Sequence, residues 1–155
     1  IDFMALLQMR PDVPEDFRAV EWLAFASNAF NTMVPFYANV ERTPEYLANT
    51  TGTVSTDNFY WTSRLIAAMA DASYNKSLFH LERYEEAVLS AGRALVNQYD
   101  AKLAAEPDAA RRAALREEAN TAIAAMLQEK AADTLDKVLF ELSSQMKNAY
   151  SRSDA

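Results

Sequence analysis

The sequence contains no cysteine and is poor in turn formers, with only two glycines and five prolines among its 155 residues. The lack of cysteine excludes a disulfide framework, a cysteine metal site and a thiol nucleophile within this chain. So few glycines and prolines disfavour an all-β fold with many tight turns. A reducing compartment is the simplest setting for a cysteine-free chain, so we expect the protein to be cytoplasmic.

The chain also lacks clustered positive charge and long apolar runs. Its net charge is −7 at pH 7, and nucleic acids and anionic membranes both bind basic surfaces, so we expect neither as a partner. No apolar run reaches the roughly 18 residues that a membrane span needs. The single histidine, His80, has no His-x-x-x-His or Glu-x-x-His pattern around it. We therefore expect no metal ion and no cofactor.

Two apolar stretches, residues 1–9 and 19–26, predict strands that are covered on both faces. Between them, residues 10–18 carry two prolines and three acids and predict a connection, which makes the strands antiparallel neighbours. A two-stranded ribbon is only marginally stable in water, and the chain opens at Ile1 inside the first stretch. We expect partner strands from another chain or from a missing part of a longer polypeptide.

Helical patterns fill the sequence after residue 43. They predict a short helix after Thr43-Pro44, one from caps at 55–57 to about 74, one over 77–105, and one from Pro107 to about 150. A straight helix over the last stretch would be about 60 Å long, so we expect a kink or short break between residues 128 and 133. The fold class is α+β, with two strands followed by three to five helices. The expected division is residues 1–42 for strands and a cleft-lining loop, and 43–155 for helices.

Residues 27–37 mix short polar side chains with large apolar ones where predicted sheet gives way to helix. This mixture is typical of a loop that lines a concave site, although a buried crossover with asparagines bonded to backbone groups has the same composition. The candidate substrate-binding residues of this segment are Ser27, Asn28, Asn31, Phe36 and Tyr37.

Arg10 is a further candidate, because it stands beside Asp12 at a predicted strand end. An arginine held by an aspartate can bind a substrate carboxylate with two hydrogen bonds; an ion pair that merely holds the loop is the alternative. By residue chemistry alone, the chain carries no convincing catalytic constellation.

Six ordered motifs span about residues 6 to 75: Leu6-Leu-Gln-Met-Arg-Pro-Asp12, Val20-Glu-Trp-Leu-Ala24, Ser27-Asn-Ala-Phe30, Val34-Pro-Phe-Tyr37, Thr43-Pro-Glu-Tyr46 and Asp57-Asn-Phe-Tyr-Trp-Thr62. In this order they resemble the C-terminal part of the cysteine dipeptidases of the dipeptidase A type, relatives of the secernins. The helical stretch from Ser77 onward is compatible with that family but carries little signature.

The resemblance implies an N-terminal-nucleophile hydrolase with an αββα sandwich, acting on dipeptides or short peptides. In such an enzyme the cysteine at the mature amino terminus attacks the scissile carbonyl, and its own α-amino group acts as the base. This chain has no cysteine, so no catalytic residue is expected in it. The nucleophile would lie on a missing N-terminal part, and the chain alone would be inactive.

Within that resemblance, the two strands belong to an incomplete sandwich, and residues 27–37 form one wall of the substrate cleft. We also expect a homo-oligomer, because uncovered strand edges favour pairing with a second chain. The alternative function is a non-enzymatic helical module, in which the amphipathic helices after Ser77 bind a partner or dimerise.

Overall fold

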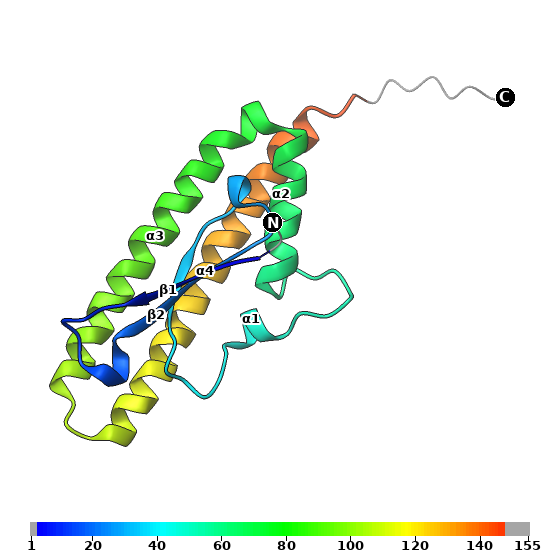
Figure 1. Ribbon diagram of the computed structural model, residues 1–155. Coiled ribbons are helices and arrows are strands. Elements are labelled where there is room, and N and C mark those ends of the chain that lie inside the picture. The colour runs from blue at the N-terminus through cyan, green and yellow to red at the C-terminus, as the bar shows by residue number, and fades with distance from the viewer. Residues whose placement is uncertain (1–2, 148–155) are drawn as a thin grey trace.

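The computed structural model describes residues 3–147, except for the side chain of Asn28. A three-stranded antiparallel sheet comes first and four helices follow (Figure 1). The elements are β1 (Phe3–Met9), β2 (Ala19–Phe25), β3 (Val34–Tyr37), α1 (Glu45–Ala48), α2 (Phe59–Ala72), α3 (Tyr74–Ala105) and α4 (Ala109–Ser144), with single turns η1 (Glu15–Phe17) and η2 (Asn28–Phe30). The predicted α+β class is confirmed.

The sheet has the order β1-β2-β3, and it contains a strand that the sequence pattern does not reveal. Residues 34–37 are predicted as a cleft-lining loop but form β3, all four residues of which are buried. Pro35 lies opposite Trp22 in the register with β2. At this position the backbone nitrogen points away from β2, because the neighbouring pairs make the hydrogen bonds. Proline is therefore tolerated in this edge strand.

The helices α3 and α4 run antiparallel and side by side, and the sheet crosses them (Figure 1). The predicted short break between residues 128 and 133 is wrong, because α4 is one continuous helix from Ala109 to Ser144. Its buried positions continue through that region at Leu127, Ala131 and Thr134. The 32-residue helix α3 offers a partner of similar length, so packing supports α4 without a break. None of the helices described in residues 3–147 is both long and apolar enough to cross a membrane.

Two helix boundaries differ from those predicted. Helix α2 is capped by Asn58, whose side chain accepts a hydrogen bond from the N–H of Trp61 at 2.9 Å. The predicted caps at 55–57 precede this residue and lie in the loop. The break between α2 and α3 falls at Ser73, so α3 begins three residues before the predicted start at Ser77.

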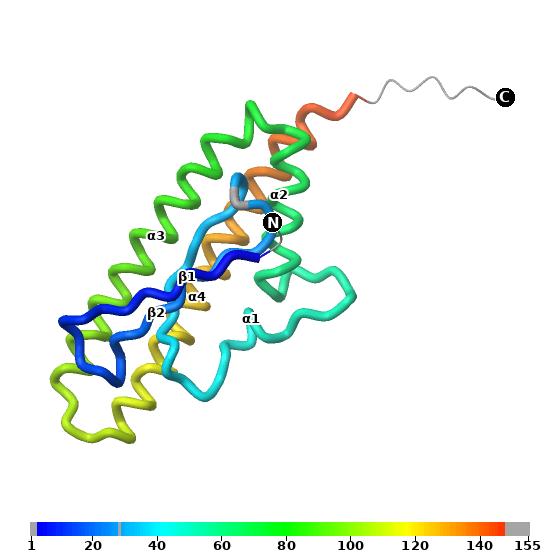
Figure 2. Tube along the Cα trace, viewed as in Figure 1, coloured from blue at the N-terminus to red at the C-terminus, as the bar shows by residue number. Residues whose placement is uncertain are grey.

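Burial increases across the sheet from β1 to β3. All residues of β1 are at least partly exposed, β2 is half-buried, and β3 is buried throughout. The prediction that both apolar stretches are covered on both faces is therefore wrong for β1. Figure 2 shows β1 in front of β2, and it is β3, at the other edge of the sheet, that contacts both α3 and α4. The helical layer reaches only part of the sheet and leaves β1 uncovered.

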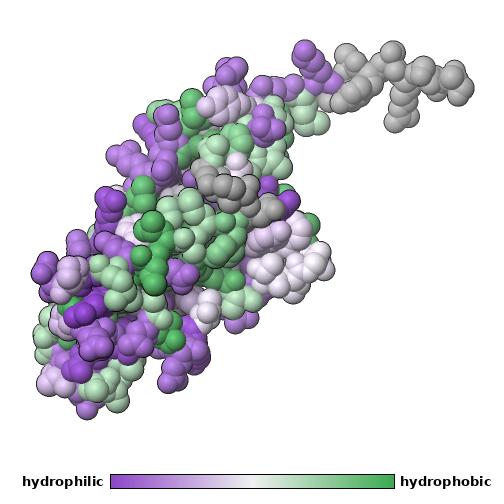
Figure 3. All heavy atoms as spheres, viewed as in Figure 1, coloured by the Kyte–Doolittle hydropathy of each residue, from purple (hydrophilic) through white to green (hydrophobic). Residues whose placement is uncertain are grey.

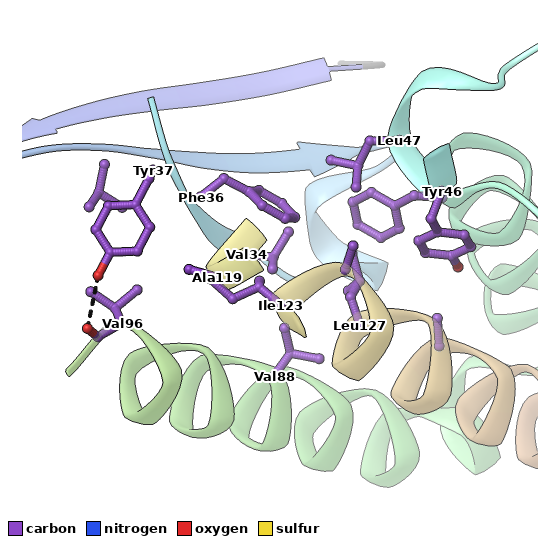
Figure 4. Packing of buried hydrophobic residues seen from close by; sticks show 14 of the residues in the cluster. Val34, Phe36, Tyr37, Tyr46, Leu47, Val88, Val96, Ala119, Ile123 and Leu127 are labelled. Carbon is purple, nitrogen blue, oxygen red and sulfur yellow. Dashed lines mark hydrogen bonds between the residues drawn. The ribbon is translucent and has the colours of Figure 1, made fainter. Parts of the chain in front are cut away.

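The core forms where β3 meets the long helices. Figure 4 shows Val34 and Phe36 among Val88 of α3 and Ile123 and Leu127 of α4. Gly92 allows helix α3 to lie close against strand β3. A Cβ atom at this position would lie 2.8 Å from Cδ of Pro35, so the helix can lie against the strand only because the side chain is absent.

Substitution of Gly92 by alanine tests this contact. An alanine would ordinarily stabilise a helix interior by about 1 kcal/mol, but overpacking against a proline ring in a strand costs about 1–3 kcal/mol. We expect Gly92→Ala to lower the free energy of unfolding by about 1 kcal/mol, measured by urea denaturation.

The matched control is Gly52→Ala, since a Cβ atom at Gly52 meets no heavy atom within 4 Å. We expect this exposed loop change to stay within about 0.5 kcal/mol of the unchanged protein. A Gly92→Ala variant as stable as the control would contradict the tight approach of α3 to β3.

Candidate functional site

The backbone of Tyr37 is bound by one side chain of helix α4. The N–H of Tyr37 donates to Oδ1 of Asn120 at 2.8 Å, and Nδ2 of Asn120 donates to the Tyr37 carbonyl oxygen at 3.0 Å. These backbone groups point away from β2, because the pair of Tyr37 and Val20 is a non-hydrogen-bonded one in the ladder and β3 is the edge strand. The asparagine amide therefore acts as the missing neighbouring strand, and it satisfies a buried donor and a buried acceptor together.

The side chain of Tyr37 connects the sheet to helix α3. Its hydroxyl lies 3.0 Å from the carbonyl oxygen of Val96, the contact drawn in Figure 4, and 2.7 Å from Oδ1 of Asp100. Burial raises the pKa of Tyr37 well above its usual value, and the hydrogen bond to the Asp100 carboxylate raises it further. The hydroxyl thus remains a proton donor at all ordinary pH values.

Arg10 completes this group from the end of β1. Its Nη1 lies 2.5 Å from Oδ2 of Asp100, and its Nη2 donates to the carbonyl oxygen of Phe17 at 2.6 Å. Its Nε donates to the carbonyl oxygen of Arg18 at 3.3 Å. The sequence pairs Arg10 with Asp12, and this pairing is wrong: the partner is Asp100 of α3, because packing brings α3 beneath this end of the sheet. All three guanidinium nitrogens serve internal contacts; the role of Arg10 in substrate binding stays a prediction.

The turn after β2 contains the second group of candidate residues. Ala26 has φ of 63° and is 4% exposed, a left-handed conformation that costs a non-glycine residue about 1–2 kcal/mol. Asn31 holds the turn, since its Nδ2 donates to the carbonyl oxygen of Phe25 and its Oδ1 accepts from the N–H of Thr32 at 2.8 Å.

Ser27 precedes η2 and is half-buried, and its side chain makes no capping hydrogen bond to that turn. Asn28 begins η2, but its side chain lies outside the described residues. The hydroxyl of Ser27 is therefore not used to cap η2.

The six candidate residues form two groups rather than one. Tyr37 pairs with Val20 and Arg10 lies beside Arg18, at one end of β2, whereas Ser27 to Asn31 follow its other end. Seven residues of strand separate the two groups by about 20 Å. Phe36 is 5% exposed and points away from Tyr37, toward the side on which Tyr46 and Leu47 lie (Figure 4). Phe36 and Tyr37 are both core residues of this structure.

Sequence reasoning missed two residues of the first group, Asp100 and Asn120. Asn120 interrupts an apolar stripe of α4 between Ala119 and Ile123, and it is 2% exposed. A lone amide on an apolar helix face is a signal for a buried hydrogen-bonding role. Nothing in the sequence indicates its partner. Across residues 3–147 there is no cluster of three or more histidine, aspartate or glutamate side chains that could hold a metal ion.

The family model "Peptidase family C69" matches residues 2–87, which includes both groups of candidate residues. A protein named "Probable dipeptidase A" from Streptococcus pyogenes serotype M3 (strain SSI-1) is 41% identical over 150 residues, covering 97% of this chain. A "Dipeptidase" of Bifidobacterium longum (strain NCC 2705) is 35% identical over 188 residues, again covering 97% of this chain. The chain spans only 31% and 35% of the length of these two relatives, and it looks like a C-terminal part of them.

Asn120→Ala tests the bond between α4 and the sheet edge. The change leaves the N–H and carbonyl oxygen of Tyr37 buried without their partner, and each such group costs about 1–3 kcal/mol. We expect a loss of about 2–4 kcal/mol in the free energy of unfolding, measured by chemical denaturation. Asn97→Ala, the same change at an exposed position of α3, is the control and should lie within about 0.5 kcal/mol. Equal losses of unfolding free energy in the two variants would contradict a stabilising role for the hydrogen bonds between Asn120 and the Tyr37 backbone.

Alkaline unfolding tests the burial of the tyrosines. In the unfolded chain a tyrosine ionises near pH 10. Burial and the hydrogen bond to Glu118 raise the pKa of Tyr99 to about 12 in the folded protein. The pKa of Tyr37 is raised further. The folded protein therefore keeps protons that the unfolded chain loses, so the free energy of unfolding falls as pH rises above 10, by about 1.4 kcal/mol per pH unit per tyrosine. Tyr37→Phe should be less stable at pH 7 but show a flatter alkaline decline. If the unfolding free energies of Tyr37→Phe and of the unchanged protein fell in parallel above pH 10, the raised pKa of Tyr37 would be contradicted.

Proposed function

This chain belongs to peptidase family C69, and on that premise we propose that it is the C-terminal part of a dipeptidase that hydrolyses dipeptides or short peptides. The support comes from the relatives, since those that match nearly the whole chain are named dipeptidases. Because the chain spans about a third of their length, the reaction belongs to the longer polypeptide. The chain itself supplies structure and one wall of the substrate cleft.

The nucleophile of the proposed enzyme is a cysteine at the mature amino terminus of the longer polypeptide. The thiolate attacks the scissile carbonyl, the α-amino group of the same residue takes the thiol proton, and that proton passes to the leaving amine. Water then hydrolyses the acyl-enzyme and releases the second product. No cysteine occurs in the present chain, so we propose that it is inactive alone.

The turn after β2 is the part of this chain that we assign to the cleft. The observation that carries this assignment is the left-handed conformation of Ala26, because strained backbone at a buried position clusters at functional sites. Ser27, Asn28 and Asn31 follow directly. Asn31 is a positioning residue, since its side chain bonds to the backbone of the turn. Ser27 is the residue that we propose to contact the peptide.

The other candidate residues support this wall from the far end of the sheet. Arg10, Phe36 and Tyr37 are engaged in internal contacts or buried in the core, so we propose that they fix the sheet rather than bind peptide. In this proposal residues 1–42 supply the sheet and the cleft turn, and residues 43–155 supply the helical layer beneath them.

The test is dipeptide hydrolysis by the longer polypeptide that carries this chain. We expect cleavage within a broad dipeptide panel, and a Ser27→Ala variant with kcat/KM lowered about tenfold, the effect of losing one hydrogen bond of about 1.4 kcal/mol. Its melting temperature should be unchanged. Ser90→Ala, at an exposed position of α3, is the control and should retain full activity. A longer polypeptide that cleaves no dipeptide in the panel would overturn the proposed function.

A second function has one observation in its favour. Phe79 of α3 and Leu139 and Phe140 of α4 are exposed by 53%, 50% and 68%, and the ends of the helices that carry them meet through His80 and Glu141, whose Nε2 and Oε1 atoms lie 3.3 Å apart. Large apolar side chains that are exposed at neighbouring helix ends mark protein interfaces where they gather into a patch. A helical dimerisation module would therefore form a stable complex at micromolar concentration in sedimentation; a monomer would exclude it.

A further inference from the structure

Strand β1 is an edge strand without the usual protection against pairing. None of its residues from Phe3 to Met9 is charged or proline, although natural edge strands ordinarily carry charge, proline or a bulge. Four of its large side chains are more than half exposed: Phe3, Leu6, Leu7 and Met9. Figure 3 shows apolar surface in the middle of the face on which β1 lies, with hydrophilic surface around it.

The backbone of β1 directs a regular set of groups to the open edge. The N–H of Arg10 donates to the carbonyl oxygen of Arg18, which fixes the phase of the antiparallel ladder. Hydrogen-bonded pairs alternate along such a ladder, so the backbone groups of Met4, Leu6 and Gln8 point to β2. Those of Ala5, Leu7 and Met9 point to the other side, where no further strand lies within residues 3–147.

The two edges of the sheet are therefore different. At β3 the outward groups of Tyr37 bond to Asn120 of α4, which closes that edge within the chain. At β1 no helix of the described residues performs this role, because α3 and α4 lie beneath β2 and β3. The fold closes one edge with a side chain and leaves the other edge available.

The face of β1 that is turned toward the helices is also open. A groove of about 520 Å³ lies between this strand and α3, with Leu6, Trp22, Met33 and Leu89 in its walls. Arg93 stands at the same groove with its guanidinium 5.8 Å from the Trp22 ring centre. The opposite face carries Phe3, whose ring centre lies 5.4 Å from that of Phe25. Both faces of β1 thus present apolar side chains to solvent.

We propose that the part of the longer polypeptide that this chain does not contain docks on β1. It adds an uncharged strand to the open edge, hydrogen-bonded to Ala5, Leu7 and Met9, and its apolar side chains cover Leu7 on one face and fill the groove at Leu6 on the other. This inference rests on the proposed function only for the existence of the longer polypeptide. The length of the relatives supports this occupant. The chain matches the Streptococcus pyogenes relative over 97% of its own residues but spans only 31% of that protein.

A second copy of this chain fits the surface less well. Two identical edge strands pair antiparallel about a two-fold axis that is perpendicular to the sheet. The exposed faces of both copies then lie on the same side, so the Phe3, Leu7 and Met9 side chains of both remain in water. Such a dimer would satisfy the edge but would leave this apolar face of both copies uncovered.

The experiment is residue-resolved amide hydrogen exchange of the longer polypeptide. We expect the outward amides of Ala5, Leu7 and Met9 to exchange as slowly as the inward amides of Leu6 and Gln8. In this chain prepared alone, the outward amides should exchange much faster than the inward ones. Outward amides in the longer polypeptide that exchange as fast as those of the exposed loop at residues 51–53 would overturn the proposal.

Leu7→Lys in the longer polypeptide provides the matched substitution. A charge at the covered face should loosen the added strand, so exchange at Ala5 and Met9 should accelerate about tenfold or more. Val54→Lys is the control, because Val54 is exposed by 55%, comparable with 64% for Leu7, and lies in a loop away from the sheet. It should leave exchange in β1 unchanged, and an equal acceleration by both variants would count against the docking surface.

The remaining outcomes separate this proposal from its alternatives and from the proposed function. Protection of the outward amides that appears in the isolated chain and rises with its concentration assigns the surface to a second copy and overturns the proposal. Slow outward exchange in a longer polypeptide without dipeptidase activity supports the docking and contradicts only the function. Dipeptidase activity with fast outward exchange contradicts only the docking.

Discussion

The hydrogen bonds of Tyr37 hold the two halves of the chain together. Its backbone is bound by Asn120 of α4, and its hydroxyl reaches Val96 and Asp100 of α3. Each bond contributes only about 1 kcal/mol net, but the bonded groups are buried, so the loss of any partner leaves an unsatisfied group whose desolvation costs more. Through Asp100 the same group fixes Arg10, and with it the connection between β1 and β2.

This attachment at one edge explains the unequal burial of the sheet. β3 is held against the long helices, β2 is half-covered, and β1 extends beyond the helical layer. The same attachment places the turn at residues 26–31 at the far end of β2, about 20 Å from the Arg10 and Tyr37 group. The proposed docking strand is therefore the part of the sheet that the helices support least directly, whereas the turn after β2 packs against α2 and the start of α3.

The family signal in the sequence is strong because it rests on ordered motifs along the first half of the chain. Those motifs do not distinguish a residue that binds a ligand from one that fixes the sheet. The segment 27–37 reads as one loop, but its last four residues form β3, and Phe36 and Tyr37 are core residues. Asn31 bonds to the backbone of its own turn, which is the structural role that the composition equally allowed.

The sequence by itself determined the α+β class, the approximate helix limits and the family, because hydrophobic periodicity, capping residues and motif order are local properties of the chain. Only the tertiary structure decided that Arg10 binds Asp100 rather than Asp12 and that Asn120 closes the edge of β3, since these partners lie 90 and 83 residues apart. It also decided that α4 runs unbroken and that β1 remains uncovered. Such features depend on which surfaces meet in space, and a one-dimensional pattern records only that a surface is apolar.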